Sequence, residues 1–176
     1  MSRTNPFKKK RRVAKETILF FVEGADEKNF FDYLKSLFTR DSGIAIRVKN
    51  AFGGGADAVL ESVLRQSGYH SVYCVYDVDT NPKKKNEDAV DKAGVKRLPQ
   101  QPCFEAFLLE ILEEKKYNHH LQCAPCKKRF QKEYLRKSKA MTKDDCAKLF
   151  SKSLLEKRAK SIPLLAEVIT IFSGKK

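Results

Sequence analysis

The chain has 176 residues, of which 41% are hydrophobic and 10% aromatic, so it can bury the core of one domain or of one domain with a small extension. No apolar run approaches the roughly eighteen residues of a transmembrane helix, and no apolar segment typical of a secretory signal follows the basic N-terminus. The net charge of +14, from 36 Lys and Arg against 22 Asp and Glu, favours a polyanionic partner such as DNA or RNA over a membrane surface.

The N-terminal residues 1–15 are polar and basic, which predicts a disordered arm that either contacts phosphates or is simply solvated. Beyond them, short apolar runs alternate with helical patterns. This alternation predicts an α/β core over residues 16–101, with a mostly parallel, Rossmann-like sheet flanked by helices. We expect four strands, at 17–22, 44–49, 71–76 and 94–98. We expect helices at 26–39 (with Asp26 as its N-cap), 56–67 and 86–93.

The sequence changes character after Pro99 and Pro102. Residues 103–116 have an amphipathic helical pattern, and most of the remaining sequence is helical and basic, so we expect residues 102–176 to form a helical part packed on the core. A last helix is expected over 154–172, kinked or broken at Pro163. The cations crowded in the middle of this part are candidates for binding a nucleic-acid backbone: Lys127, Lys128, Arg129, Lys132, Arg136, Lys137 and Lys139.

Acidic residues end two of the predicted strands, with Glu23 after the first and Asp77 and Asp79 after the third. Side chains alternate along a strand, so Asp77 and Asp79 are expected on one side. The carboxyl ends of neighbouring parallel strands meet at one edge of the sheet, which should bring all three acids together. Crowded carboxylates repel one another unless a cation neutralises them, which predicts bound Mg²⁺, or alternatively Mn²⁺. The competing interpretation of Asp77-Val78-Asp79 is a polar turn.

Two other acids and a glycine run have both a functional and a structural interpretation. Glu27 and Glu105 each fall in the first turn of a predicted helix, where they either point into the metal pocket or complement the helix dipole. Gly53-Gly54-Gly55 precedes a helix and either cradles a phosphate or forms a flexible loop. It matches neither a Walker motif nor a dinucleotide-binding fingerprint.

The five cysteines are odd in number, which argues against a disulfide framework and favours reduced thiols in the cytoplasm. His119, Cys123 and Cys126 have residue types and spacing found in zinc sites. Structural zinc usually joins two separated ligand pairs, however, so zinc is not expected at these residues. No His and Asp arrangement supports Cys103 as a nucleophile.

Three segments, in this order and spacing, resemble the RloB-like proteins, a branch of the TOPRIM superfamily related to the OLD-family nuclease domain. The segments are ILFFVEGADEKNFF, YCVYDVD and PCFEAFLL, and the resemblance covers about residues 17–112. It implies a TOPRIM α/β fold with a Mg²⁺-dependent nuclease site. In that site Glu23 would act as general acid/base or metal ligand, and Asp77 and Asp79 would hold metal. Glu27 would be a candidate ligand of a second ion. Glu105 would be the acid of the third motif. The resemblance also implies a role in antiphage defence beside an ATPase of the ABC/AAA type.

Residues and resemblance together favour an enzyme, a metal-dependent nuclease that hydrolyses phosphodiester bonds of DNA or RNA. The alternative is a non-catalytic nucleic-acid-binding subunit of a defence complex. A nucleotidyl transferase or primase-like enzyme ranks last, because the chain is short for such an enzyme.

Overall fold

The computed structural model of the chain describes residues 16–40, 42–79, 81–113, 122–135 and 140–174. The predicted basic arm at 1–15 lies outside these ranges. Strands and helices first alternate: β1 (Glu16–Val22), α1 (Ala25–Phe38), β2 (Ile44–Asn50), α2 (Gly55–Val63), β3 (Ser71–Asp77), α3 (Lys84–Lys92) and β4 (Lys96–Gln100). Helices alone follow: α4 (Phe104–Glu113), α5 (Cys123–Glu133), α6 (Lys143–Leu149), α7 (Lys152–Ala159) and α8 (Pro163–Ser173).

The four strands form one parallel sheet in the order β2-β1-β3-β4. The chain therefore moves outward from β1 to β2 and then returns to the other side of β1 to add β3 and β4. This reversal makes the carboxyl ends of β1 and β3 the switch point of the sheet, which is where open α/β sheets bind ligands. The predicted α/β class with a parallel sheet is confirmed.

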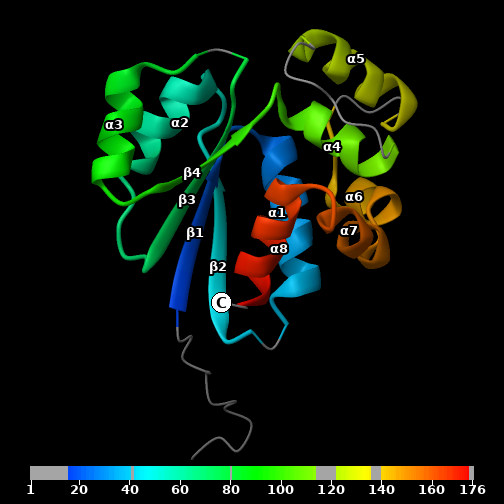
Figure 1. Cartoon of the computed structure of the whole chain (residues 1–176), viewed down its shortest axis with the longest axis horizontal. Helices are drawn as coiled ribbons and strands as arrows, with labels where there is room; N and C mark the ends of the chain where they lie inside the picture. The colour runs from blue at the N-terminus through cyan, green and yellow to red at the C-terminus, as the bar shows by residue number, and fades with distance from the viewer. Residues whose placement is uncertain (1–15, 41, 80, 114–121, 136–139, 175–176) are drawn as a thin grey trace, which may run out of the picture.

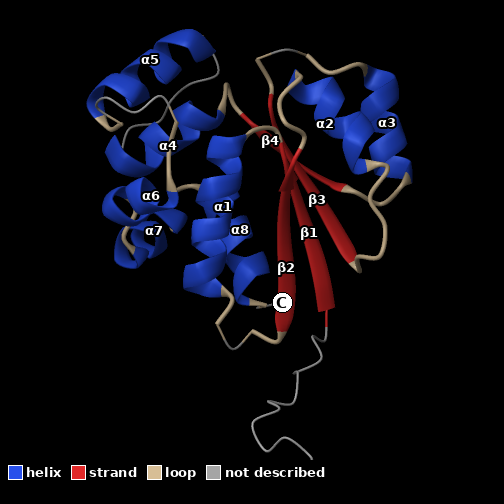
Figure 2. Ribbon diagram, turned by 180° about the vertical axis from the view of Figure 1, so that it is seen from behind, coloured by secondary structure: helices blue, strands red, loops and turns tan. Residues whose placement is uncertain are grey.

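Both faces of the sheet are buried, as parallel sheets require. Helices α2 and α3 cover one face, and α1 and α8 cover the other, as the two opposite views show (Figures 1 and 2). Side chains of β1 divide by parity: Ile18, Phe20 and Val22 join the core on the α1 side, and Leu19 and Phe21 join the core on the α2 side. The continuous apolar sequence of β1 is therefore explained by burial on two sides.

The helical part shares its core with the sheet. One cluster of buried side chains runs from β1 and α1 through α4 to α8. Phe172 of α8 packs edge-on against Phe20 of β1, with ring centroids 4.7 Å apart. Asn29 and Asp26 of α1 bond the backbone of Met141, just before α6. The C-terminal helices are therefore fixed to the layer that carries α1.

Several predicted boundaries differ from the structure. The break expected at Pro163 is present: residues 154–172 lie in two helices, α7 and α8, and Pro163 is the first residue of α8, where a missing N–H costs nothing. Gly24 rather than Asp26 is the N-cap of α1, which leaves the Asp26 carboxylate to accept from the Met141 N–H at 3.1 Å. Helix α2 ends at Val63, short of the predicted residue 67.

Candidate metal centre

Four carboxylates gather at the switch point. Glu23 follows β1 and Asp77 is the last residue of β3, while Glu27 lies in the first turn of α1 and Glu105 in the first turn of α4. The charges of the other three all raise the pKa of Asp77. The structure thus brings together four of the five acids that the sequence pointed to.

Asp77 is the most constrained of these acids, with only 4% of its surface exposed. Its Oδ1 accepts the backbone N–H of Phe104 at 2.8 Å, which fixes the carboxylate at the N-terminus of α4. Burial, followed by the charges of Glu27, Glu23 and Glu105, raises its pKa to about 8. The positive charge of Lys127, 3.8 Å from Oδ2, acts in the opposite direction. In the protein without an added cation, this site therefore favours a protonated Asp77 near neutral pH.

Glu27 is held close to the backbone of its own helix. Burial raises its pKa to about 7, and the nearby Glu23 and Glu105 add to the shift. A Cβ on Gly24 would lie 2.9 Å from Glu27 Oε2, so only glycine leaves room for this position of the carboxylate. The helix-dipole interpretation and the metal-pocket interpretation of Glu27 are compatible, because its carboxylate is both beside the helix start and close to the other acids.

Three polar side chains at this edge have buried atoms without a hydrogen-bond partner among the described residues. They are Oε2 of Glu23, Oε2 of Glu105, and both amide atoms of Gln100. Gln100 is 1% exposed and pairs with Asp77 in the β3–β4 register. Val75 and Leu98, two residues earlier on each strand, belong to the core on the α1 side, so Asp77 and Gln100 face that side too. Buried polar atoms are costly when unpaired, which is a reason to expect a ligand here.

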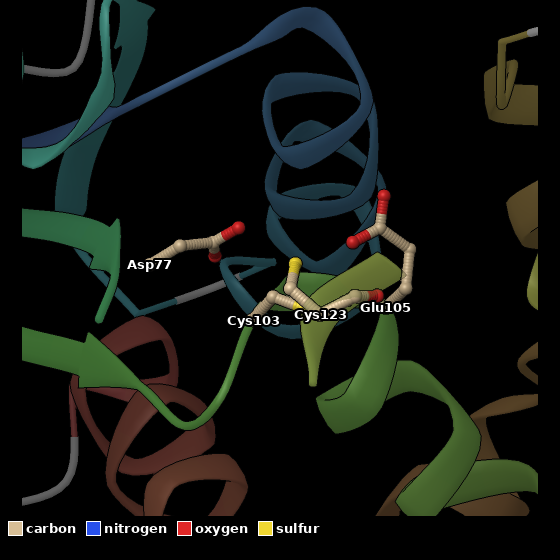
Figure 3. Close-up of side chains that lie close together, drawn as sticks. All are labelled: Asp77, Cys103, Glu105 and Cys123. Carbon is tan, nitrogen blue, oxygen red and sulfur yellow. The ribbon is translucent and has the colours of Figure 1, made fainter. Parts of the chain in front are cut away.

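Two thiols complete the cluster. Asp77, Cys103, Glu105 and Cys123 each offer a ligand atom, and these atoms all lie within 4.8 Å of one another. Figure 3 shows the four side chains converging from β3, the start of α4 and the start of α5. Burial raises the pKa of the Cys103 thiol well above its usual range and that of Cys123 to about 11. A protonated thiol is a poor nucleophile, which agrees with the expectation that Cys103 is not one.

Asp79 is more exposed than the four gathered carboxylates. Strand β3 ends at Asp77, so the alternation that was expected to align the two aspartates does not extend to Asp79. Its side chain is exposed. Its charge still raises the pKa of Cys123, which places it at the rim of the same site.

The basic residues predicted to bind nucleic acid have different positions. Lys127 turns toward the acids: burial lowers its pKa, but Glu105, Cys123 and Asp77 more than compensate and keep it above the usual value. Lys128, Arg129 and Lys132 are exposed on α5, where Arg129 contacts Glu113 and Glu133. The other three predicted cations, Arg136, Lys137 and Lys139, lie outside the described residues, as does the zinc candidate His119.

Sequence reasoning missed Gln100. It considered Cys103 only as a nucleophile and Cys123 only as a zinc ligand with His119 and Cys126, and it did not place either thiol beside the carboxylates. The Cys103-Phe104-Glu105 spacing was a usable signal, because it places a thiol and a carboxylate at the start of one helix. For Cys123 no local pattern indicated which distant residues it would meet.

No helix within the described ranges is long and apolar enough to cross a membrane. In comparisons with family models, with curated proteins and with solved structures, nothing matches this chain.

Proposed function

We propose that this protein is a Mg²⁺-dependent nuclease of the TOPRIM type that hydrolyses phosphodiester bonds of DNA or RNA. The observation that carries the proposal is the gathering of Glu23, Glu27, Asp77 and Glu105 at the switch point, with buried oxygens of Glu23 and Glu105 unpaired within the described structure. Carboxylate oxygens are the ligands that Mg²⁺ prefers, so the donor set fits this ion.

Each residue then has a role that its position supports. Bound Mg²⁺ would activate water and stabilise charge on the scissile phosphate. Asp77 is a suitable ligand because the Phe104 N–H already orients its carboxylate. Glu23 follows β1, one of the two inner strands, and is the candidate general acid/base. Lys127, with its side chain 45% exposed, can turn from Asp77 toward a substrate phosphate.

The charge of the chain supports a nucleic-acid substrate. The net charge is +14, and exposed cations of α5 lie on the same helix as Lys127. Contacts from such side chains are electrostatic, so binding should weaken steeply with salt and depend little on sequence. An ATPase partner and a role in antiphage defence rest on the resemblance to RloB-like proteins and stay predictions.

A second function, a nucleic-acid-binding subunit without catalysis, is favoured by one contact. Lys127 Nζ lies 3.8 Å from Asp77 Oδ2, so the acids already have a cation of the chain itself beside them. In that case the carboxylates would not bind a metal ion. They would instead form ion pairs with Lys127 and thereby fix the position of α5.

The test is cleavage of plasmid, single-stranded DNA and RNA in Mg²⁺, Mn²⁺ or EDTA. The variants are Glu23→Gln and Asp77→Asn, which keep side-chain size, and the matched control is Asp88→Asn, an exposed acid on α3. We expect metal-dependent cleavage that falls roughly 100-fold or more in the two site variants, while nucleic-acid binding and the Asp88→Asn activity are retained.

Cleavage that survives in both site variants would show that another site, or a contaminant, is responsible. Binding without cleavage under every condition would reject a nuclease that works alone and favour the binding subunit.

A further inference from the structure

We propose that Asp77, Cys103, Glu105 and Cys123 form a binding site for a thiophilic divalent ion, with Zn²⁺ as the expected occupant. This site shares Asp77 and Glu105 with the carboxylate cluster but differs from it by two sulfur donors. Thiolates select Zn²⁺ and related ions over Mg²⁺, which prefers oxygen. Burial favours the protonated form of both thiols in the metal-free protein, so binding of the ion would displace their two protons to solvent. The proposal concerns metal binding and is tested by metal binding. Because Asp77 and Glu105 belong to both sites, Zn²⁺ bound here would compete with the Mg²⁺ of the proposed function.

The spacing of the four candidate atoms can be compared with that of a tetrahedral centre. Zinc bonds of about 2.0 Å to oxygen and about 2.3 Å to sulfur place neighbouring ligand atoms about 3.3 to 3.8 Å apart. The four candidate atoms already lie within 4.8 Å of one another. They come from β3, from the residue before α4, from the first turn of α4 and from the first residue of α5 (Figure 3). Small side-chain movements would therefore bring them to bonding positions.

Independent observations at the same place point to a ligand. Gln100 is 1% exposed, pairs with Asp77 in register and has two amide atoms unpaired among the described residues. Glu105 Oε2 is also buried there without a partner. Lys127, the cation now beside Asp77, has a side chain that is 45% exposed and can turn into solvent when an ion enters.

The experiment titrates the reduced protein with Cd²⁺, whose bonds to thiolates give an ultraviolet charge-transfer band, and then displaces it with Zn²⁺. We expect one ion per chain. Cys103→Ala and Cys123→Ala should each lower affinity by at least about tenfold, because even outer contacts of metal ligands are worth that much. The matched controls are Cys74→Ala and Cys146→Ala, which remove buried thiols elsewhere in the core. Circular dichroism verifies that each variant is folded.

Asp77→Asn and Glu105→Gln separate the oxygen ligands from the thiols. Each should weaken Cd²⁺ binding while the charge-transfer band persists at saturation. The proposal is overturned if the wild-type protein shows no band, if the band survives in the double variant of Cys103 and Cys123, or if the control variants lose binding equally.

A second, independent observation concerns Phe52, and the inference from it rests on the proposed function. Phe52 is 91% exposed and has φ of +62°, a left-handed conformation that is rare for a bulky residue. The flanking amides bind the end of β1: Ala51 N–H donates to Val22 O at 2.9 Å, and Gly53 N–H donates to Glu23 O at 3.0 Å. The ring is thus held in solvent beside the backbone that carries Glu23. We infer that Phe52 stacks on an unpaired base of the nucleic acid at the site.

The chain contains no tryptophan, so Phe52→Trp creates a single tryptophan, whose emission can be followed apart from that of the six tyrosines. The matched control is Leu64→Trp, at the other end of α2, where the native side chain is 40% exposed. In EDTA, a single-stranded oligonucleotide should quench Phe52→Trp but not Leu64→Trp. Phe52→Ala should bind it roughly five- to a hundredfold more weakly than wild type.

The outcomes separate the two proposals. If the wild-type protein binds the oligonucleotide but Phe52→Trp is not quenched, or Phe52→Ala binds as well as wild type, the stacking role is wrong and the nuclease proposal is untouched. If the wild-type protein binds no nucleic acid, both are wrong.

Discussion

At the scale of single residues, Arg158 has the clearest structural role. Its guanidinium is buried, with 8% of the residue exposed, and it donates to two carbonyls near the end of α4: Nε to Ile111 O at 3.1 Å and Nη2 to Glu110 O at 2.6 Å. A cation at a helix C-terminus is favourable both as a donor and as a charge. Arg158 therefore joins α7 to the helix that carries Glu105.

We expect Arg158→Ala to lower the free energy of unfolding by about 2–4 kcal/mol, because it removes charged donors from buried carbonyls. Urea unfolding measures the loss. Lys160→Ala, an exposed cation at the C-cap of the same helix, is the matched control and should change stability by less than about 0.5 kcal/mol. Equal losses in the two variants would show that the buried hydrogen bonds are not the cause.

For single residues of the site, some positions could be predicted from the sequence and others could not. The proximity of Glu23 and Asp77 follows from strand ends in a parallel sheet, and the structure confirms that they are neighbours. The position of Asp79 does not follow, because it depends on whether β3 continues for two more residues. Cys123 was recognised from its spacing as a candidate zinc ligand, but its partners could not be predicted, because its contacts depend on how α5 packs on α4.

At the scale of elements, periodicity predicted the α/β part well. All four strands and the helices between them occur where apolar runs and amphipathic patterns indicated. The fourth strand was expected to end at residue 98, before Pro99, but β4 continues through Pro99 to Gln100. Strand β4 is at the edge of the sheet, where a missing N–H need not break a ladder. Edge position is a property of the assembled sheet, so the local sequence could not reveal it.

At the scale of the whole molecule, the sequence predicted a helical C-terminal part but not which elements its helices pack against. Helix α8 returns to the sheet and packs beside α1, which closes the core over β1 (Figure 1). The alternating part and the helical part consequently share one apolar cluster. The candidate site lies where these parts meet, since β3 supplies Asp77 while α4 and α5 supply Glu105 and Cys123. Movement of the helical part relative to the sheet would therefore alter the site directly.

The acids of this site should also make the stability of the whole molecule depend on pH. In the folded protein the pKa of Glu27 is about 7 and that of Asp77 about 8, against ordinary values of 4.5 and 3.8. A carboxyl group whose pKa is raised on folding binds more protons in the folded state. Its contribution to stability is complete below its ordinary pKa and is lost as the pH rises through the folded value. Without added metal, these two groups should therefore lower the free energy of unfolding as the pH rises from about 4 to about 8.

Asp77→Asn isolates this effect, because an amide of the same size neither ionises nor repels Glu27. We expect urea unfolding in EDTA, measured at several values from pH 5 to pH 9, to show a smaller loss of stability with rising pH in Asp77→Asn than in the wild-type protein. The exposed control Asp88→Asn should follow the wild-type curve. A divalent ion that binds the carboxylates stabilises only the folded state, so its addition should restore most stability at the alkaline end, where the acids are ionised. If the curves for Asp77→Asn and wild type run parallel over the whole range, the carboxylates are not crowded in solution, and the physical basis for a cation at this site is lost.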